Sequence, residues 1–142
     1  MATRRPWWLK AGIQGTLSLL PQPQRWNRLL QRYVTRNIHL RDRTFQRKWD
    51  QVRWHYKHWS ARRDNPIGVA LELGTGWHPI VPIGLALLGV PRVITIDITD
   101  MVSQRTLAEV LNAYVALLDG EIGDVAVSQE RASIIRELAA AP

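Results

Sequence analysis

Two carboxylates and a glycine turn are the residues of this chain whose types and spacing could bind a ligand. Glu72 lies near the end of an apolar run, Val69 to Leu73, a glycine turn follows at 74–76, and Asp97 closes a second apolar run, 93–96. Glycines after a strand allow a tight turn and let a ligand approach the backbone, because no Cβ stands in the way. A carboxylate that closes the next strand can accept hydrogen bonds from a ribose diol. This spacing is typical of a nucleotide-binding unit.

The elements that must position these residues are a strand, a loop, a helix and a second strand. Continuous Val, Ile and Leu favour a parallel strand that is buried on both faces. The apolar segment from Ile80 to Leu88 predicts a helix, with Pro79 and Pro82 in its first turn, where a missing N–H costs little. In open α/β sheets the ligand lies at the carboxyl ends of the strands, and the helix N-terminus there favours an anionic group.

The glycine pattern differs from the dinucleotide fingerprint G-x-G-x-x-G, because Pro79 stands at the third glycine. The stretch Glu72-Leu73-Gly74-Thr75-Gly76 instead resembles motif I, [D/E]-x-G-x-G, of the class I S-adenosylmethionine-dependent methyltransferases. Asp97 stands where that family places the acid at the end of its second strand. The resemblance runs from Val69 into the segment after Asp97. It departs from the family at His78, where a further glycine is common, so this loop is bulkier.

The resemblance implies a cofactor, S-adenosylmethionine, and a set of residues that bind it. These residues are Glu72, Gly74, Thr75, Gly76, Asp97 and Ile98. The two glycines would pass under the methionine part of the cofactor, and Glu72 would orient its amino group. Asp97 would hold the ribose hydroxyls, and Ile98 would lie against the adenine. The implied reaction is transfer of a methyl group to an acceptor. Neither the acceptor nor any catalytic residue is identified by the sequence.

The predicted fold is α/β, with a basic, Trp-rich helical N-terminal region at 1–66 and a partial Rossmann-like cofactor-binding domain at 67–142. The second region would be the first β-α-β-α of the methyltransferase fold. That family has a seven-stranded sheet, whereas this chain shows two clear strands and an ambiguous segment, 122–127, that is either a short strand or a loop. We therefore expect the N-terminal portion, or a truncated form, of a methyltransferase that is too short to be active alone.

Several stretches have apolar residues at helical spacing. The clearest follows Asp42, the expected N-cap, and consists of Phe45, Trp49, Val52, Tyr56 and Trp59. Others run from about residue 24 to 37, from 107 to 118, and after Ser128. A single aromatic stripe on a basic helix is either a core face or a platform for stacking nucleic-acid bases. We favour the core face.

Charge is distributed unevenly along the chain. Residues 1–63 hold 15 of the 19 Lys and Arg and two acids, a balance of +13, whereas residues 64–142 hold four and ten, a balance of −6. A basic, Trp-rich half could bind nucleic acid or an anionic membrane surface, the latter through an amphipathic segment around Trp7 and Trp8. The first alternative to an enzyme is therefore a nucleic-acid- or anionic-surface-binding protein that uses residues 1–63. A second is an NAD-binding oxidoreductase fragment.

Other function classes are excluded or disfavoured by composition. The chain has no cysteine, which excludes disulfides and thiolate metal sites and fits a cytoplasmic location. No apolar run reaches the length of about 18 residues that a transmembrane helix needs. His55 and His58 have no acid at a metal-ligand spacing, so we expect no metal site. His78 could be a general base or a pocket wall, but simple packing beside the helix start is the interpretation that we favour.

Overall fold

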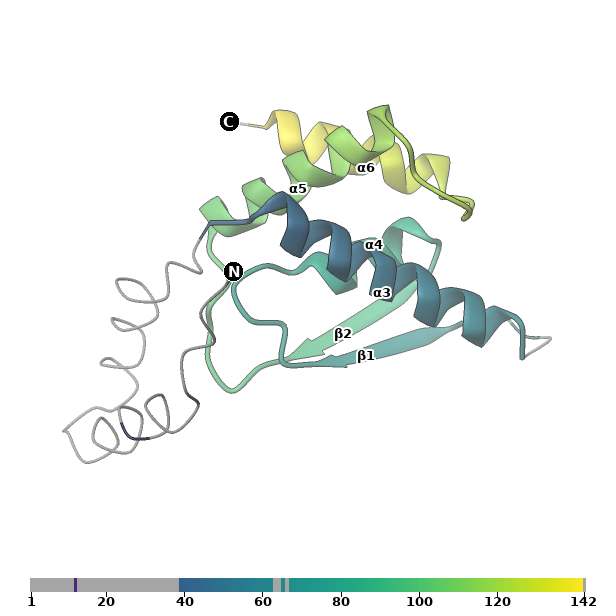
Figure 1. Ribbon diagram of the computed structural model, residues 1–142, viewed down its shortest axis with the longest axis horizontal. Helices are drawn as coiled ribbons and strands as arrows, with labels where there is room; N and C mark the ends of the chain where they lie inside the picture. The colour runs from purple at the N-terminus through teal and green to yellow at the C-terminus, as the bar shows by residue number, and fades with distance from the viewer. Residues whose placement is uncertain (1–11, 13–38, 63–64, 66, 142) are drawn as a thin grey trace, which may run out of the picture. The chain divides into compact units, whose positions relative to one another are not determined.

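The structure, a computed structural model, describes residues 12, 39–62, 65 and 67–141. From residue 39 onward these contain α3 (Asp42–Ser60), β1 (Val69–Leu73), α4 (Ile80–Leu87), β2 (Arg92–Ile96), α5 (Gln104–Asp119) and α6 (Gln129–Ala140) (Figure 1). The helix expected near 24–37 and the amphipathic segment around Trp7 lie outside the described residues. No helix among the described residues is both long and apolar enough to cross a membrane.

The compact unit that contains the described helices and strands runs from His39 to Pro142, and residues 1–38 lie outside it. The basic helix α3 therefore belongs to the same unit as the two strands. The expected boundary at residue 66 falls between α3 and β1, inside this unit. The change of charge along the sequence consequently does not coincide with the limit of the compact unit.

The two strands form a parallel sheet joined through α4, so the expected β-α-β unit is confirmed. The register runs from Val69 opposite Arg92 to Leu73 opposite Ile96. Gly89, with φ of 91°, ends the connecting helix in the left-handed conformation that glycine adopts without strain. The chain can therefore turn sharply from α4 into β2, which places the carboxyl ends of both strands side by side.

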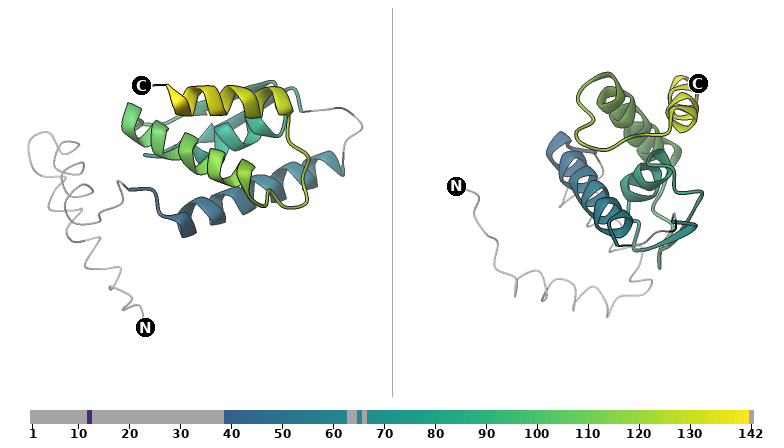
Figure 2. Two further views of the ribbon diagram at one scale, coloured as in Figure 1. Left: turned by 90° about the horizontal axis from the view of Figure 1, so that it is seen from above. Right: turned by 90° about the vertical axis from the view of Figure 1, so that its right-hand side faces the viewer.

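The helices described from residue 39 onward, α3 to α6, lie on one side of this sheet (Figures 1 and 2). The side chains of Ala70, Glu72 and Val93 face the helices and are partly buried. The opposite face is exposed and mostly apolar, with Arg92 at the end that lies opposite Val69. Its apolar residues are Val69, Leu71, Leu73, Ile94 and Ile96. The expectation that the first strand is buried on both faces is therefore wrong for the described residues, because none of the described helices packs on this second face.

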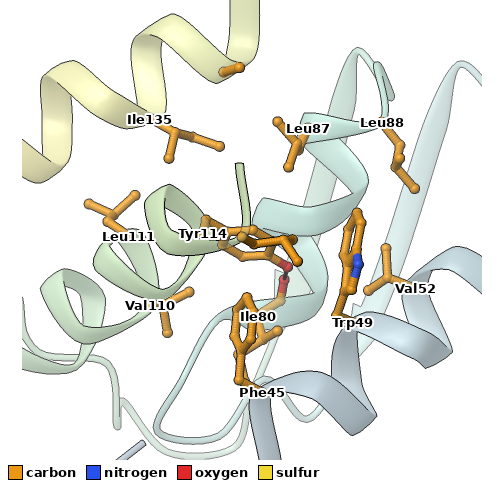
Figure 3. Packing of buried hydrophobic residues seen from close by; sticks show 12 residues of the cluster. Phe45, Trp49, Val52, Ile80, Leu87, Leu88, Val110, Leu111, Tyr114 and Ile135 are labelled. Atoms are coloured by element: carbon orange, nitrogen blue, oxygen red, sulfur yellow. Dashed lines mark hydrogen bonds between the residues drawn. The ribbon is translucent and has the colours of Figure 1, made fainter. Parts of the chain in front are cut away.

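The core lies between the helices and is built around two aromatic residues of α3 and one of α5 (Figure 3). The ring of Tyr114 meets Phe45 and Trp49 edge to face, with centroid distances of 4.9 and 5.9 Å. Its hydroxyl donates a hydrogen bond of 2.7 Å to the carbonyl of Ile80 in α4. The core interpretation of the aromatic stripe is confirmed for Phe45 and Trp49, whereas Trp59 at its end is 42% exposed.

Local sequence signals account for most helix ends. Ser103 begins α5 with a reciprocal capping box, and Ser128 caps α6 as predicted. Asp42 is the first helical residue of α3 and not its N-cap, which is Arg41. The ambiguous segment 122–127 is a loop.

Candidate functional site

The glycine loop begins where β1 ends, directly beside the end of β2. The N–H of Gly74 donates to the carbonyl of Ile96 at 2.8 Å, which joins the two strand ends. Gly74 and Gly76 have φ of 82° and 70°, a backbone conformation that residues with a Cβ rarely adopt. A Cβ built at either glycine would meet no other atom within 4 Å. Both glycines are therefore required by the backbone conformation and not by crowding, and the loop borders open space.

Asp97 holds this loop in place. One oxygen of its exposed carboxylate accepts the N–H of Gly76 at 2.8 Å, and the other accepts the N–H of Thr99 at 3.1 Å. These backbone donors, Gly76 foremost, lower the pKa of Asp97 below its usual value. Because a carboxylate has about four lone-pair positions, Asp97 can still accept hydrogen bonds from a ligand. The structure thus adds a role that the sequence did not indicate, which is to join the glycine loop to the segment after β2.

Glu72 and Thr75 each supply one buried polar atom, and the two side chains lie near each other. Among the described residues, Glu72 Oε2 and Thr75 Oγ1 are buried and have no hydrogen-bond partner of good geometry. Burial raises the pKa of Glu72, while the nearby Thr75 hydroxyl and the charge of Lys48 oppose the shift. Buried polar atoms without partners are rare and cost free energy. A ligand that donates hydrogen bonds here would remove this cost.

The predicted site residues lie together at the carboxyl edge of the sheet, but one of them, Ile98, is fully exposed. Glu72 and Asp97 flank the glycine loop, and Thr75 is part of it. The side chain of Ile98 follows Asp97 but is 100% exposed, so no described residue covers it. Ile98 therefore presents an exposed apolar side chain and does not line an enclosed pocket.

A pocket of about 480 Å³ lies beside β1, between that strand, α3 and α4. Its lining is mostly apolar and consists of Val52, His55, Tyr56, Trp59, Ile67, Val69, Ala70, Leu71, Glu72, Leu73, Val81 and Leu85. Glu72 therefore belongs both to the wall of this pocket and to the end of the strand where the glycine loop begins. The volume lies within the range of small-molecule sites.

A cluster around Glu109 of α5 positions the other side of the glycine loop. Its Oε2 accepts the N–H of Leu40 at 2.9 Å and lies 3.3 Å from Nε2 of His78. Its Oε1 lies 3.3 Å from Nε of Arg105 and 3.6 Å from Nδ1 of His39. Burial raises the pKa of Glu109, but the hydrogen bonds, led by that from Leu40, outweigh it and lower the pKa overall. One carboxylate thus joins the loop, α5 and the segment before α3.

Sequence reasoning missed the Glu109 cluster. Its members lie on three separate elements, and no spacing in the sequence brings them together. The side chain of His78 is only 11% exposed and its Nε2 faces Glu109, so its contact in this structure holds the loop.

Within the residues that the structure describes, no group of three His, Asp or Glu side chains could hold a metal ion.

Comparison with known proteins gives no match. The chain has no significant similarity to any protein-family model, curated protein or solved structure.

Proposed function

We propose that the chain binds S-adenosylmethionine at the carboxyl edge of its sheet, as the N-terminal portion of a class I methyltransferase. The observation that carries the proposal is the hydrogen bond from Gly76 N–H to Asp97. This hydrogen bond places the acid that follows the second strand against the glycine loop that follows the first strand. One molecule of the cofactor could therefore contact the acid through its ribose and the loop through its methionine part. The motif Glu72 to Gly76 and the parallel β-α-β unit support the same reading.

Each polar end of the cofactor finds a fitting group. The buried, unpartnered oxygens of Glu72 and Thr75 would accept hydrogen bonds from the cofactor's ammonium group. The open space over Gly74 and Gly76 would admit its methionine chain close to the backbone. The remaining lone pairs of Asp97 would accept from the ribose hydroxyls, and Ile98 would contact the adenine.

When bound, this cofactor supplies a methyl group on a positively charged sulfur. The residues described above would hold the donor in one orientation, which is the main requirement of an in-line displacement. They include no acceptor site and no assigned base. The exposed apolar face of the sheet fits this proposal, because open α/β sheets of this class carry helices on both faces.

Isothermal titration of the purified chain with S-adenosylmethionine, its demethylated product S-adenosylhomocysteine and NAD tests the proposal. We expect binding of the first two, weakened about tenfold or more in Asp97→Ala, since hydrogen bonds to charged groups contribute about 1.5–3 kcal/mol. Asp124→Ala is the matched control, because Asp124 is also an exposed acid but pairs with Lys57 and Arg53.

Three outcomes would overturn the proposal. A folded wild-type chain that binds neither sulfur compound would remove the cofactor assignment. Tighter binding of NAD than of both sulfur compounds would favour the alternative, an NAD-binding oxidoreductase fragment. If Asp97→Ala and Asp124→Ala weaken binding equally, the cofactor does not bind at this edge of the sheet.

A further inference from the structure

The outward side of α3 carries cations and aromatic residues that the core does not use. Arg43, Arg47, Trp54 and His58 are four, seven and four positions apart, so they share one side of the helix, and Arg62 follows just beyond its end. All five are exposed. We call them the α3 outer face. Other described elements pack on the opposite side of the helix (Figure 2).

Trp54 is the centre of this surface and is held in a fixed orientation. Its side chain is 56% exposed. The ring of His58 lies against it, with centroids 4.0 Å apart and planes 30° apart, and the ring of His55 meets it edge-on at 5.1 Å. Nδ1 of His58 lies 2.8 Å from the carbonyl oxygen of Trp54 and must donate, because a carbonyl only accepts. One side of the indole is therefore supported and the rest is left to solvent.

The arginines of the α3 outer face are available for a partner. Among the described residues, the ion pairs of α3 involve Arg53 and Lys57, which contact Asp124, with Arg53 also contacting Asp50 at 2.6 Å. None of the ion pairs in this part of the chain involves Arg43, Arg47 or Arg62. Their charge is thus unpaired, whereas Arg53 and Lys57 of the same helix are paired with acids.

We propose that the α3 outer face binds single-stranded nucleic acid. A base would stack on the open side of Trp54, and Arg43, Arg47 and Arg62 would contact the phosphates along the helix. A supported aromatic ring among unpaired arginines is the combination that such ligands use, since every base offers a stacking face and every nucleotide a negative charge. This inference does not rest on the proposed cofactor site.

An anionic membrane fits the same surface less well. A helix that lies in a membrane interface buries a broad apolar face. The apolar face of α3 is already occupied by the core, through Phe45, Trp49 and Val52. The α3 outer face has one large apolar residue, Trp54, which is too little for insertion.

Fluorescence anisotropy with labelled single-stranded oligouridylate and oligothymidylate tests this inference on the full chain. We expect Trp54→Ala to weaken binding about tenfold, since stacking on one base contributes about 1–3 kcal/mol, and Trp54→Phe to weaken it less. Arg43→Gln with Arg47→Gln should weaken binding and reduce its salt dependence. Trp59→Ala controls for loss of another exposed tryptophan of α3, and Arg92→Gln with Arg131→Gln controls for loss of two charges.

The controls separate the α3 outer face from the other basic residues of the chain. Binding by the wild type that Trp54→Ala leaves unchanged, or weakens no more than Trp59→Ala does, would overturn the inference, because the ligand would then bind elsewhere. Absence of oligonucleotide binding would also overturn it. Trp54-dependent binding to vesicles of anionic lipid without oligonucleotide binding would assign a membrane instead. Circular dichroism should show unchanged helix content in each variant. If Trp54→Ala does not fold, the affinity of Trp54→Phe is compared with that of the wild type instead, and unchanged affinity would overturn the inference.

Discussion

Asp97 connects the two halves of the candidate site through its backbone partners. Its carboxylate accepts from Gly76 on one side and Thr99 on the other, so the loop after β1 depends on a charge at the end of β2. The two hydrogen bonds are stronger when the carboxylate is ionised, because both donors are backbone N–H groups. The geometry of the glycine loop should therefore respond to the protonation of this residue.

Acid should weaken the fold partly through Asp97. Since its pKa is lowered in the folded state, its stabilisation is present above the unfolded value of about 3.9 and is lost as the pH falls through the lower folded value. We expect the free energy of unfolding, measured in urea from about pH 6 to about pH 2, to fall less steeply for Asp97→Asn than for the wild type. An unchanged pH dependence in this variant would contradict the role given to Asp97.

Gly76→Ala should destabilise the chain through backbone strain alone. Its φ of 70° is unfavourable for alanine, and a Cβ there meets nothing within 4 Å, so no clash adds to the effect. We expect a loss of about 1–2 kcal/mol in unfolding free energy, measured in urea. Gly68→Ala is the control, because Gly68 has equal space and no positive φ. Equal effects of the two substitutions would show that the loop does not require the left-handed conformation.

At the scale of elements, α5 positions the glycine loop through Glu109. Glu109→Gln keeps the shape of the side chain but weakens its hydrogen bonds to Leu40 N–H, His78 and Arg105. We expect a loss of about 1–2 kcal/mol in unfolding free energy and faster hydrogen exchange of the amides in the loop. Glu121→Gln, an exposed acid in a loop, should change neither. Unchanged exchange in Glu109→Gln would mean that Glu109 does not hold the loop.

The elements could be predicted from the sequence because their signals are local. Runs of Val, Leu and Ile mark β1 and β2, Gly89 marks the end of α4, and Ser128 marks the start of α6, so the predicted bounds of these elements lie within about one residue of those observed. The helical pattern from 107 to 118 missed the first turn of α5, which begins at Gln104. The contacts of the site could not be predicted in this way. Gly76 and Asp97 are 21 positions apart, and Leu40 and Glu109 are 69 apart, so their meeting depends on how the helices pack. The role of Asp97 in a ligand site is still a prediction.

At the scale of the whole unit, a sheet covered on one face only is a surface for association. Leu71 and Leu73 are 60% and 73% exposed on its apolar face. Large exposed apolar patches and open strand edges favour contacts between molecules. Within the compact unit, this face is the clearest departure from a two-sided α/β sheet.

We expect the purified chain to self-associate with rising concentration, and Leu71→Thr to reduce the association while keeping a residue that favours strands. Sedimentation velocity over a range of concentrations measures both. Val102→Thr, which removes an exposed apolar residue outside the sheet, should leave the association unchanged. A wild type that stays monomeric at high concentration would show that this face is covered in solution.

The central claim is that a cofactor binds at the carboxyl edge of the sheet. The most direct test is a titration of the isotopically labelled chain with S-adenosylhomocysteine, followed by the NMR shifts of its backbone amides. Our account predicts that the amides of Gly74, Gly76 and Ile98 shift first and most, while those of α6 stay in place. Saturable shifts centred on other elements, or no shifts in a folded chain, would contradict it.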